Sequence, residues 1–256
     1  MKVVILAGGL GTRLIEETNI KPKPMVEIGG YPILWHIMKI YSSYGFNDFI
    51  ICLGHKGHVI KDFFSKYYLN NNDFTIKTNN ENITIHKRTS ESWNISLIDT
   101  GSETMTGGRI LKIKKYLNNE PFMLTYGDGV SNINIKKLLD HHKSSKKYCT
   151  LTAVKPEARF GVLDIDGNNL VTSFAEKNQE DIGWINGGFF VCEQEIFNYL
   201  RNDKEVWERY PLESLSGINN LSAYKHKGFW KPMDTLKDKI ELNKIWDSNN
   251  APWKLW

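Results

Sequence analysis

Residues 3–14 read VVILAGGLGTRL, a short apolar run that ends in a glycine-rich turn. The run Val3–Ala7 contains no polar residue, which is typical of a strand buried on both faces. Beyond the turn, Ile33–Tyr44 has apolar residues at helical spacing, and Phe49–Leu53 is a second apolar run. A strand, a turn, a helix and a strand in this order predict a parallel sheet with helices on both faces.

The rest of the chain carries the same patterns and two hairpin signals. Clusters of turn-forming residues at Thr78–Asn82 and Asp166–Asn169 predict two β-hairpins. The other expected elements are helices at Gly57–Tyr67, Arg109–Leu117, Ile135–His142 and Leu236–Trp246, strands at Phe74–Lys77, Ile83–Lys87, Ile95–Asp99, Phe122–Tyr126, Tyr148–Val154, Phe160–Ile165 and Leu170–Phe174, and an interrupted strand at Ile185–Val191. These elements predict an α/β fold with a mixed sheet that is mostly parallel in its first half.

Length and charge narrow the class of protein. At roughly 150 residues per domain, 256 residues correspond to about 1.7 domains. We expect one domain, because no linker or repeat divides the chain. Lys and Arg (33) exceed Asp and Glu (29), which leaves a net charge of +4. No run of five basic residues accompanies this charge, so the sequence does not indicate a nucleic-acid partner.

The sequence gives no sign of membrane insertion or export. No apolar stretch approaches the about 18 residues of a transmembrane helix, and the run Val3–Ala7 is shorter than the core of a signal peptide. Cys52, Cys149 and Cys192 lie in apolar runs and form no C-x-x-C pair, as expected of reduced, buried thiols. We therefore expect a soluble cytoplasmic protein without a membrane partner.

The turn at Gly8–Leu14 lies where a ligand is expected, because open parallel sheets bind ligands at the carboxyl ends of their strands. Gly9–Leu14 lacks the third glycine of the dinucleotide fingerprint, which argues against a dinucleotide oxidoreductase. The turn ends in Gly-Thr-Arg where a P-loop has Gly-Lys-Ser/Thr. Two interpretations remain: an anion-binding turn with Arg13 as a fixed positive charge, or a tight turn with a surface arginine.

A second cation follows in the segment Lys21–Val26, which reads KPKPMV. Its prolines favour an extended backbone, and a loop can return Lys23 beside Arg13. The two cations would then serve one phosphate chain. We expect both side chains to be exposed when no substrate is bound.

These segments and later motifs resemble the sugar-1-phosphate nucleotidylyltransferases. The shared motifs are GGLGTRL at 8–14, PKPMV at 22–26, GYPIL at 30–34, ILWHIMK at 33–39, DTG at 99–101, MTGGR at 105–109, TYGDG at 125–129 and GFWKPMDT at 228–235. The resemblance covers practically the whole chain and is greatest to family members that make CDP-glucose. It implies a single-domain, Rossmann-like, three-layer α/β/α nucleotidyltransferase fold with added hairpins. Residues 1–130 would bind the nucleotide, 131–235 the sugar phosphate, and 236–256 would form a C-terminal helix and tail.

The resemblance also implies a reaction in which CTP and α-D-glucose 1-phosphate give CDP-glucose and pyrophosphate. The product would feed CDP-deoxysugars into O-antigen-type lipopolysaccharide synthesis. A phosphate monoester is largely dianionic at pH 7, since its second pKa is about 6, and its oxygen can attack the α-phosphorus without a general base. Catalysis then depends on positioning and charge. The absence of a convincing Ser-His-Asp or Cys-His set agrees with this chemistry.

Magnesium is the cofactor that the resemblance implies, with Asp128 and Asp234 as its protein ligands. Mg²⁺ is usually held by one or two carboxylates together with phosphate oxygens. Asp128 follows a buried strand and lies between two glycines, which allow a nucleotide to approach closely. The alternatives are a turn-forming aspartate at 128 and a helix N-cap at 234.

The remaining site residues come from the same resemblance. It assigns catalysis to Arg13 and Lys23, and the choice of base to Thr104 and Arg109, beside Gly107-Gly108 with its backbone donors and acceptors exposed. The sugar phosphate would be bound by Glu176, Lys177, Asn186 and Gly187, and the nucleotide by Leu6, Ala7, Gly8, Gly9, Leu10, Gly11, Thr12, Arg13, Lys23, Thr104, Arg109, Gly127 and Asp128. The alternatives are a surface ion pair at Glu176-Lys177, a β-bulge at Gly187, and a plain glycine turn with Arg109 paired on the surface.

Two other functions stay open at this point. One is a uridylyl- or thymidylyltransferase that acts on a hexose 1-phosphate, and the other is a non-catalytic regulatory protein that binds sugar nucleotides. A regulatory protein would be expected to lack Arg13, Lys23 or a metal carboxylate, and all are present. By resemblance we expect a homo-oligomer, with a hexamer as one form, and the Asn-rich hairpin or the tail at an interface.

Overall fold

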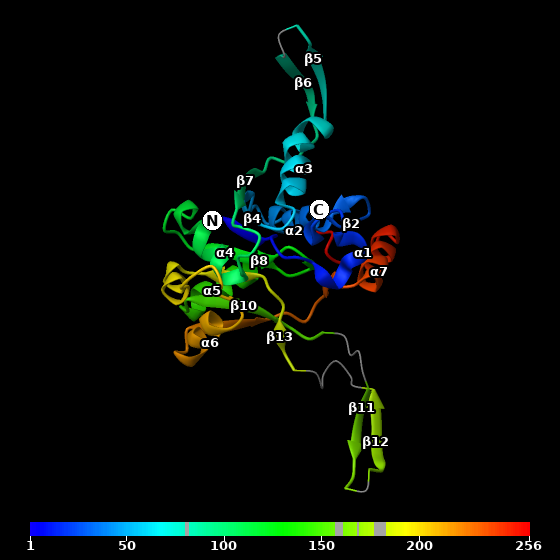
Figure 1. Ribbon diagram of the computed structural model, residues 1–256, viewed down its shortest axis with the longest axis vertical. Helices are drawn as coiled ribbons and strands as arrows, with labels where there is room; N and C mark the ends of the chain where they lie inside the picture. Colours follow the sequence, from blue (N-terminus) through cyan, green and yellow to red (C-terminus); the bar gives the residue numbers. More distant parts are fainter. Residues whose placement is uncertain (80–81, 157–160, 168, 177–182) are drawn as a thin grey trace.

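The computed structural model describes residues 1–79, 82–156, 161–167, 169–176 and 183–256 (Figure 1). One sheet organises these residues. At its centre, β1 (Val3–Leu6) pairs in parallel with β4 (Asp48–Leu53) on one side and with β8 (Phe122–Tyr126) on the other. β4 pairs in parallel with β7 (Asn94–Asp99). All four strands were expected from their apolar runs, and the parallel first half of the sheet is confirmed.

The second half of the sheet is largely antiparallel. β8 pairs with β14 (Phe190–Cys192), and β14 pairs with β10 (Cys149–Val154), both antiparallel. β10 also pairs antiparallel with β13 (Ile185–Asn186) and parallel with β15 (Leu221–Lys225). β13 and β14 are two parts of the expected interrupted strand, separated by Gly187–Phe189. Gly188 has a φ of 75°, in the left-handed region where glycine is favoured.

One face of the sheet is covered by four helices, α2 (Ile33–Ser42), α3 (Gly57–Asn70), α5 (Ile135–Ser145) and α7 (Leu236–Asp247). Alternate strand residues such as Ile5 pack against them in one buried cluster. Since successive strand residues point to opposite faces, their neighbours lie in a second cluster on the other side.

The opposite face is covered by α4 (Thr106–Ile113), the 3₁₀ helix η5 (Gln194–Tyr199) and α6 (Tyr210–Gly217). The helix expected at Arg109–Leu117 therefore begins three residues earlier and ends as a 3₁₀ turn, η3 (Lys114–Tyr116). Helices on both faces of a mixed sheet give the expected three-layer α/β/α architecture.

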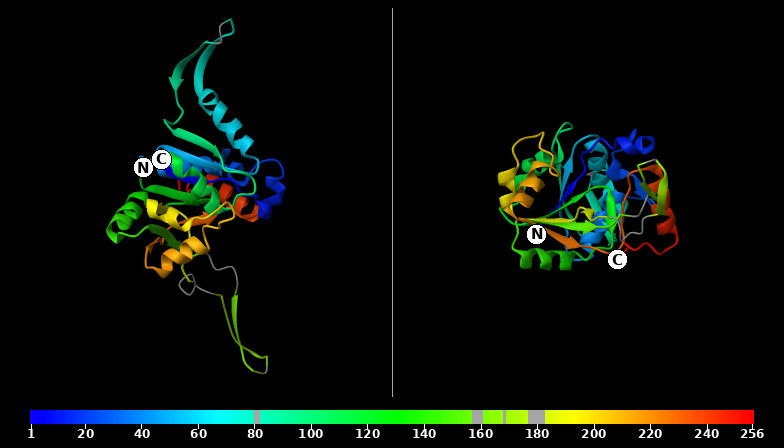
Figure 2. Two further views of the ribbon diagram at one scale, coloured as in Figure 1. Left: turned by 60° about the vertical axis from the view of Figure 1, so that its left-hand side comes forward. Right: turned by 90° about the horizontal axis from the view of Figure 1, so that it is seen from below.

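Two hairpins extend from the layered body at opposite ends (Figures 1 and 2). β5 (Asn72–Lys77) pairs with β6 (Asn82–Arg88), and β11 (Gly161–Ile165) pairs with β12 (Val171–Glu176). Both hairpins were predicted from their turn residues. Neither joins the central sheet in the described residues.

The elements that the sequence did not reveal are short. They are η1 (Thr12–Leu14), α1 (Ile15–Thr18), η2 (Lys23–Met25), β2 (Glu27–Ile28), β3 (Tyr31–Pro32), β9 (Gly129–Ser131), η5, α6, β15 and β16 (Trp230–Pro232). Most span two to six residues, which is too few for a hydrophobic period to be visible. Tertiary contacts decide their conformation.

The three expected free thiols are buried: Cys52, Cys149 and Cys192 form no disulfide, although the sulfur atoms of Cys149 and Cys192 lie 3.7 Å apart. In the described residues, every helix is too short or too polar to cross a membrane.

A cluster of tryptophans encloses His36, which is fully buried on α2. The indole nitrogen of Trp253 donates to Nδ1 of His36 at 3.3 Å, and Nε2 lies 2.8 Å from the Ile28 carbonyl. A neutral ring satisfies both contacts, with its proton on Nε2. Burial lowers the pKa of His36 from 6.5 to about 4, and the Ile28 carbonyl only partly offsets this effect.

Acid is therefore expected to destabilise the fold through His36. Its pKa is lower when folded than when unfolded, so the stabilisation is complete above pH 6.5 and is lost as the pH falls toward 4. By pH 5 the loss amounts to about 2 kcal/mol. Urea unfolding at pH 7 and pH 5, compared between the unmutated protein and His36→Gln, isolates this contribution. An equal pH effect in both proteins would contradict it, since the other histidines remain in both.

Candidate active site

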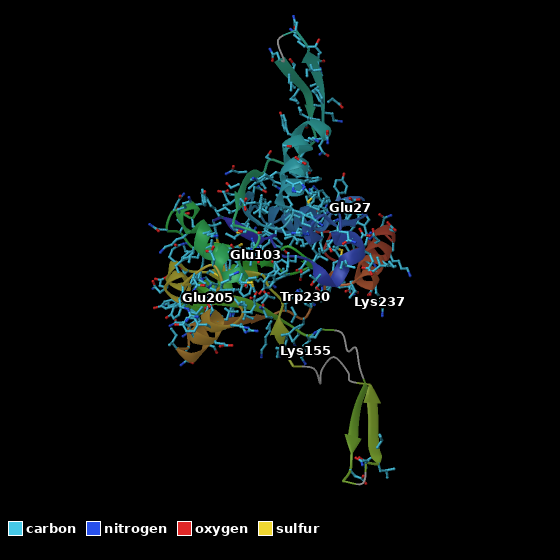
Figure 3. All side chains as sticks on the ribbon, in the orientation of Figure 1. Glu27, Glu103, Lys155, Glu205, Trp230 and Lys237 are labelled. Carbon is cyan, nitrogen blue, oxygen red and sulfur yellow. The ribbon has the colours of Figure 1, made fainter. Side chains whose placement is uncertain are left out.

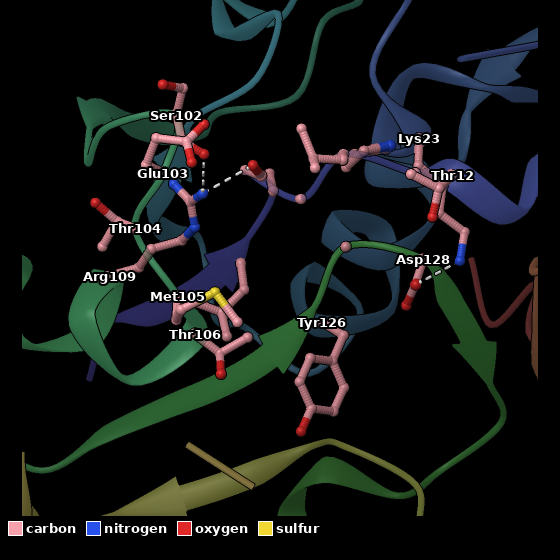
Figure 4. Close-up of a pocket in the computed structure, with 18 of the residues that line it drawn as sticks. Thr12, Lys23, Ser102, Glu103, Thr104, Met105, Thr106, Arg109, Tyr126 and Asp128 are labelled. Atoms are coloured by element: carbon pink, nitrogen blue, oxygen red, sulfur yellow. Dashed lines mark hydrogen bonds and ion pairs between the residues drawn. The ribbon is translucent and has the colours of Figure 1, made fainter. Parts of the chain in front are cut away.

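A cavity of about 440 Å³ opens at the carboxyl ends of β1 and β8 (Figure 4). Every residue that the sequence predicted to bind the nucleotide lines it. Its wall is completed by Pro24, Ser102, Glu103, Met105, Thr106 and Tyr126. The position agrees with the rule that ligands bind outside the carboxyl ends of parallel strands.

The glycine loop forms one side of the cavity. The backbone leaves β1 with Ala7 N–H bonded to the Cys52 carbonyl at 3.0 Å. Gly11 has a φ of 70°, and a Cβ there would lie 2.8 Å from the Thr18 side chain. Glycine is required at this turn for both reasons. Gly9 faces open space, so a ligand can approach its backbone directly.

Lys23 joins two carboxylates that are far apart in the sequence. Its ammonium group donates to Asp128 at 2.7 Å and to Asp234 at 2.6 Å (Figure 4 shows the first contact). Arg13 donates to the second oxygen of Asp234 at 3.0 Å. The structure thus brings together the two expected cations and the two expected metal carboxylates.

The pairing of β9 with β16 produces this convergence. Pro232 pairs with Gly129, and Met233 N–H donates to the Asp128 carbonyl at 2.8 Å. Asp234 is not the N-cap of α7: Thr235 is, in a capping box with Asp238. The carboxylate of Asp234 faces the cations Arg13 and Lys23.

The expectation that both cations are exposed is correct for Arg13 and wrong for Lys23. The Arg13 side chain is 73% exposed, whereas Lys23 is only 9% exposed. Burial alone lowers the pKa of Lys23, but Asp128 and Asp234 outweigh it and hold this pKa above the usual value. Lys23 therefore remains protonated, because the negative charges of the two carboxylates stabilise its ammonium group.

The donor set suits a hard divalent cation that is shared with phosphates. Asp128 and Asp234 offer carboxylate oxygens to the same point in space. The described residues include no group of three or more His, Cys, Asp or Glu side chains that could hold a metal alone. A Mg²⁺ ion bound between these aspartates would need phosphate and water oxygens to complete its octahedron, which is its usual environment in nucleotide enzymes.

Arg109 lies at the cavity but is neither exposed nor paired on the surface. It is 4% exposed, and Nη2 donates to the carbonyls of Gly8 at 2.8 Å and Ser102 at 3.4 Å (Figure 4). Nη1 donates to the carbonyls of Leu53 and Gly101 and to the Thr100 hydroxyl. The guanidinium group thus ties the glycine loop to the 100–102 segment.

Gly107 and Gly108 do not expose their backbone groups, contrary to the expectation. Both N–H groups donate to the Glu205 carbonyl, at 2.9 and 3.2 Å. A Cβ at Gly108 would lie 2.5 Å from the Asp203 carbonyl oxygen, and one at Gly107 would lie 2.9 Å from that of Glu205. Glycine is needed here because a loop packs directly on the start of α4.

The expected sugar-phosphate residues are only partly described. Asn186 lies beside the cavity, where its Nδ2 donates to the Tyr126 hydroxyl at 3.1 Å. The Gly187 carbonyl accepts from the Trp230 indole at 2.8 Å. Glu176 ends β12, but its side chain, like the whole of Lys177, lies outside the described residues.

The sequence predicted no individual role for Tyr126, Thr106 or Glu208, although Tyr126 and Thr106 stand within the TYGDG and MTGGR motifs. Tyr126 and Thr106 line the cavity, and the Glu208 carboxylate accepts from both hydroxyls, each at 2.7 Å. Of the TYGDG motif, only Gly127 and Asp128 were predicted to bind the nucleotide. Glu208 follows no strand and belongs to no motif, so no signal in the sequence could have found it.

Comparison with known proteins shows which family this chain matches. Residues 2–228 match the family model described as "Nucleotidyl transferase". The chain is 51% identical to glucose-1-phosphate cytidylyltransferase of Salmonella typhi and 43% identical to the probable glucose-1-phosphate cytidylyltransferase of Bacillus subtilis, each over all of both chains. The crystal structure of HddC from Yersinia pseudotuberculosis aligns with a TM-score of 0.70 at 25% identity, over 96% of this chain and 99% of that one.

Proposed function

The chain belongs to the nucleotidyl transferase family, and we propose that it transfers a cytidylyl group from CTP to α-D-glucose 1-phosphate. The products are CDP-glucose and pyrophosphate. The observation that carries this proposal is the 51% identity to a glucose-1-phosphate cytidylyltransferase over the full length of both chains. The convergence of Arg13, Lys23, Asp128 and Asp234 at the cavity supports it.

The reaction is an in-line displacement at the α-phosphorus of CTP. A phosphate oxygen of glucose 1-phosphate forms the new P–O bond, and the bond from the α-phosphorus to the bridging oxygen breaks as pyrophosphate leaves. The attacking phosphate is already anionic, so the protein has to align two polyanions and neutralise their charge. Arg13, which is exposed at the cavity, can contact the phosphate chain, and the glycine loop offers backbone N–H groups beside it.

We propose that Asp128 and Asp234 hold Mg²⁺ together with the phosphates. When bound, the ion supplies positive charge to the triphosphate and to the leaving pyrophosphate. Lys23 keeps the two carboxylates at one place through its hydrogen bonds, and Arg13 limits the movement of Asp234.

We further propose that residues 1–130 bind the nucleotide, that 131–235 bind the sugar phosphate, and that 236–256 close the core behind them. Asn186 is the described residue best placed for the hexose, because it lies next to Tyr126 at the cavity. Glu176, Lys177 and Gly187 are proposed for the same half. We also propose a cytoplasmic location, which agrees with the free thiols of the chain.

A homo-oligomer is proposed from the first hairpin. Phe74 pairs with Ile85 and Ile76 with Ile83, so four apolar side chains share one face of β5 and β6. Phe74, Ile76 and Ile83 are exposed, and Figure 3 shows the hairpin standing clear of the body. A lone two-stranded hairpin is marginally stable in water, which favours its burial against another copy. Light scattering that returned the 29.6 kDa mass of one chain would exclude this assembly.

CTP is expected to be preferred over UTP by at least about tenfold in kcat/KM, or ~1.4 kcal/mol. Cytosine differs from uracil in an amino donor and an unprotonated ring nitrogen, and a site that hydrogen-bonds these groups rejects the wrong base strongly. The loop at Gly8–Leu10 and the segment 102–106 line the cavity and offer suitable groups.

Pyrophosphate release with each of four nucleoside triphosphates and several sugar 1-phosphates measures this preference. Equal kcat/KM for UTP and CTP would leave only the broader family. Binding without any release of pyrophosphate would favour a regulatory protein instead.

A further inference from the structure

One carboxylate joins two walls of the cavity from outside it. The Tyr126 hydroxyl, at the end of β8, donates to Oε1 of Glu208 at 2.7 Å, and the Thr106 hydroxyl, at the start of α4, donates to Oε2 at 2.7 Å. Tyr126 and Thr106 line the cavity, whereas Glu208 does not. In this structure Glu208 is connected to the cavity through these two partners.

The direction of the hydrogen bonds requires a carboxylate at this position. The Thr106 hydroxyl accepts from the backbone N–H of Trp207 at 2.9 Å, and the Tyr126 hydroxyl accepts from Nδ2 of Asn186 at 3.1 Å. Each hydroxyl then has its own hydrogen left to donate. A carboxylate accepts from both, but the amide of glutamine has one accepting oxygen only. The two hydroxyl donors therefore require glutamate, and not glutamine, at position 208.

The hydrogen bonds of Glu208 continue through Tyr126 to Asn186, the residue proposed to contact the hexose. Its Nδ2 donates to Tyr126, and its Oδ1 accepts from the backbone N–H of Gly188 at 2.9 Å. These two bonds fix which way the amide points. The Tyr126 ring lies close to Gly188, where a Cβ would come within 3.0 Å of it. Glu208, Tyr126 and Asn186 therefore form one chain of hydrogen bonds that ends at the amide.

The two walls depend on Glu208 to different degrees. The wall that carries Thr106 is also held by Met105 N–H to the Asp203 carbonyl at 2.8 Å and by Gly107 N–H to the Glu205 carbonyl at 2.9 Å. For the Tyr126 hydroxyl, Glu208 is the acceptor found in the described residues. Loss of the Glu208 carboxylate should therefore disturb Tyr126 and Asn186 more than it disturbs the wall that carries Thr106.

We propose that Glu208 is a positioning residue for the hexose, which it orients by holding Tyr126 and, through Tyr126, the amide of Asn186. The proposal rests on the proposed function, because it requires a sugar 1-phosphate beside Asn186. It assigns a specificity role to an exposed glutamate that does not itself line the cavity.

The test is steady-state kinetics of Glu208→Gln with each substrate varied in turn. We expect KM for glucose 1-phosphate to rise about tenfold, with KM for CTP and kcat changed less than about threefold. Tyr126→Phe should show the same pattern. In the double variant, Glu208→Gln should add less than about twofold to the effect of Tyr126→Phe, since both act on one chain of hydrogen bonds. Glu213→Gln, the same change at an exposed position on α6, is the matched control and should leave both KM values unchanged.

Three outcomes would overturn the proposal: no change in KM for glucose 1-phosphate, an equal rise in both KM values, or effects of the two substitutions that multiply in full. If Glu208→Gln does not fold, Glu208→Asp replaces it in the same assay, because aspartate keeps the charge but its side chain is too short to keep both hydrogen bonds. An unmutated protein that makes no CDP-glucose would refute the proposed function, which is a different result from an active protein with an unaltered Glu208→Gln variant.

Discussion

Asp128→Asn is expected to lower kcat by about 10²–10³, the scale of losing one key electrostatic contact in a reaction that depends on charge. Asparagine has nearly the same shape but no negative charge, so the affinity of the site for Mg²⁺ should fall. Lys23 keeps its second carboxylate, Asp234, and the fold should survive. Asp234→Asn should act in the same direction.

The measurement is kcat against Mg²⁺ concentration, together with a thermal melt of each variant. Asp247→Asn, on the exposed end of α7, is the control and should behave like the unmutated protein. Chelation by EDTA should abolish turnover and excess Mg²⁺ should restore it. Full activity in EDTA would exclude the metal role of these aspartates.

Lys23→Ala is expected to lower both turnover, by about 10² or more, and stability. Alanine would leave Asp128 and Asp234 facing each other without the ammonium that lies within 2.7 Å of both. Breaking a fully buried pair costs about 3–5 kcal/mol, and the partial exposure of the two carboxylates reduces this to about 1–3 kcal/mol.

Denaturant unfolding and kcat should be measured on three variants. Lys21→Ala removes an ion pair to the more exposed Glu27 and should cost less than about 1 kcal/mol. Arg13→Ala should lose turnover with little loss of stability, because its side chain is exposed. A Lys23→Ala variant as stable as the unmutated protein would contradict the structural part of the argument.

The raised pKa of Lys23 adds a pH dependence with a definite sign. Because this pKa is higher in the folded state, its contribution to stability is complete below 10.5 and disappears as the pH rises through the folded-state value. The unmutated protein should therefore lose stability in alkali more steeply than Lys23→Ala.

The strands and the glycine loop could be predicted because their signal is local. Phe122–Tyr126 is an apolar run with a glycine directly after it, and β8 has these bounds. The burial of Lys23 could not be predicted, because KPKP describes only the backbone around it. What buries it is a pairing between β9 and β16, which brings a carboxylate from 211 residues away.

The environment of Arg109 could not be predicted from the sequence for a similar reason. The MTGGR motif places a cation at the start of a helix but does not tell which side of the helix it occupies. The structure turns it inward between Gly8 and Gly54, where a Cβ at either position would collide with its guanidinium group. Glu208 shows the same limit, since its partners come from β8 and α4.

The interruption between β13 and β14 makes the cavity sensitive to insertions and deletions. Along β10, the pairs at Ala153 and Thr150 are three residues apart, whereas their partners Asn186 and Val191 are five apart, so two residues are extra. The left-handed backbone at Gly188 and Phe189 takes up these two residues. The facing of Asn186 is set by its own pair with Ala153. A deletion that shortens this turn would pull Asn186 out of that pair and away from Tyr126, so the length of the segment is expected to be restricted.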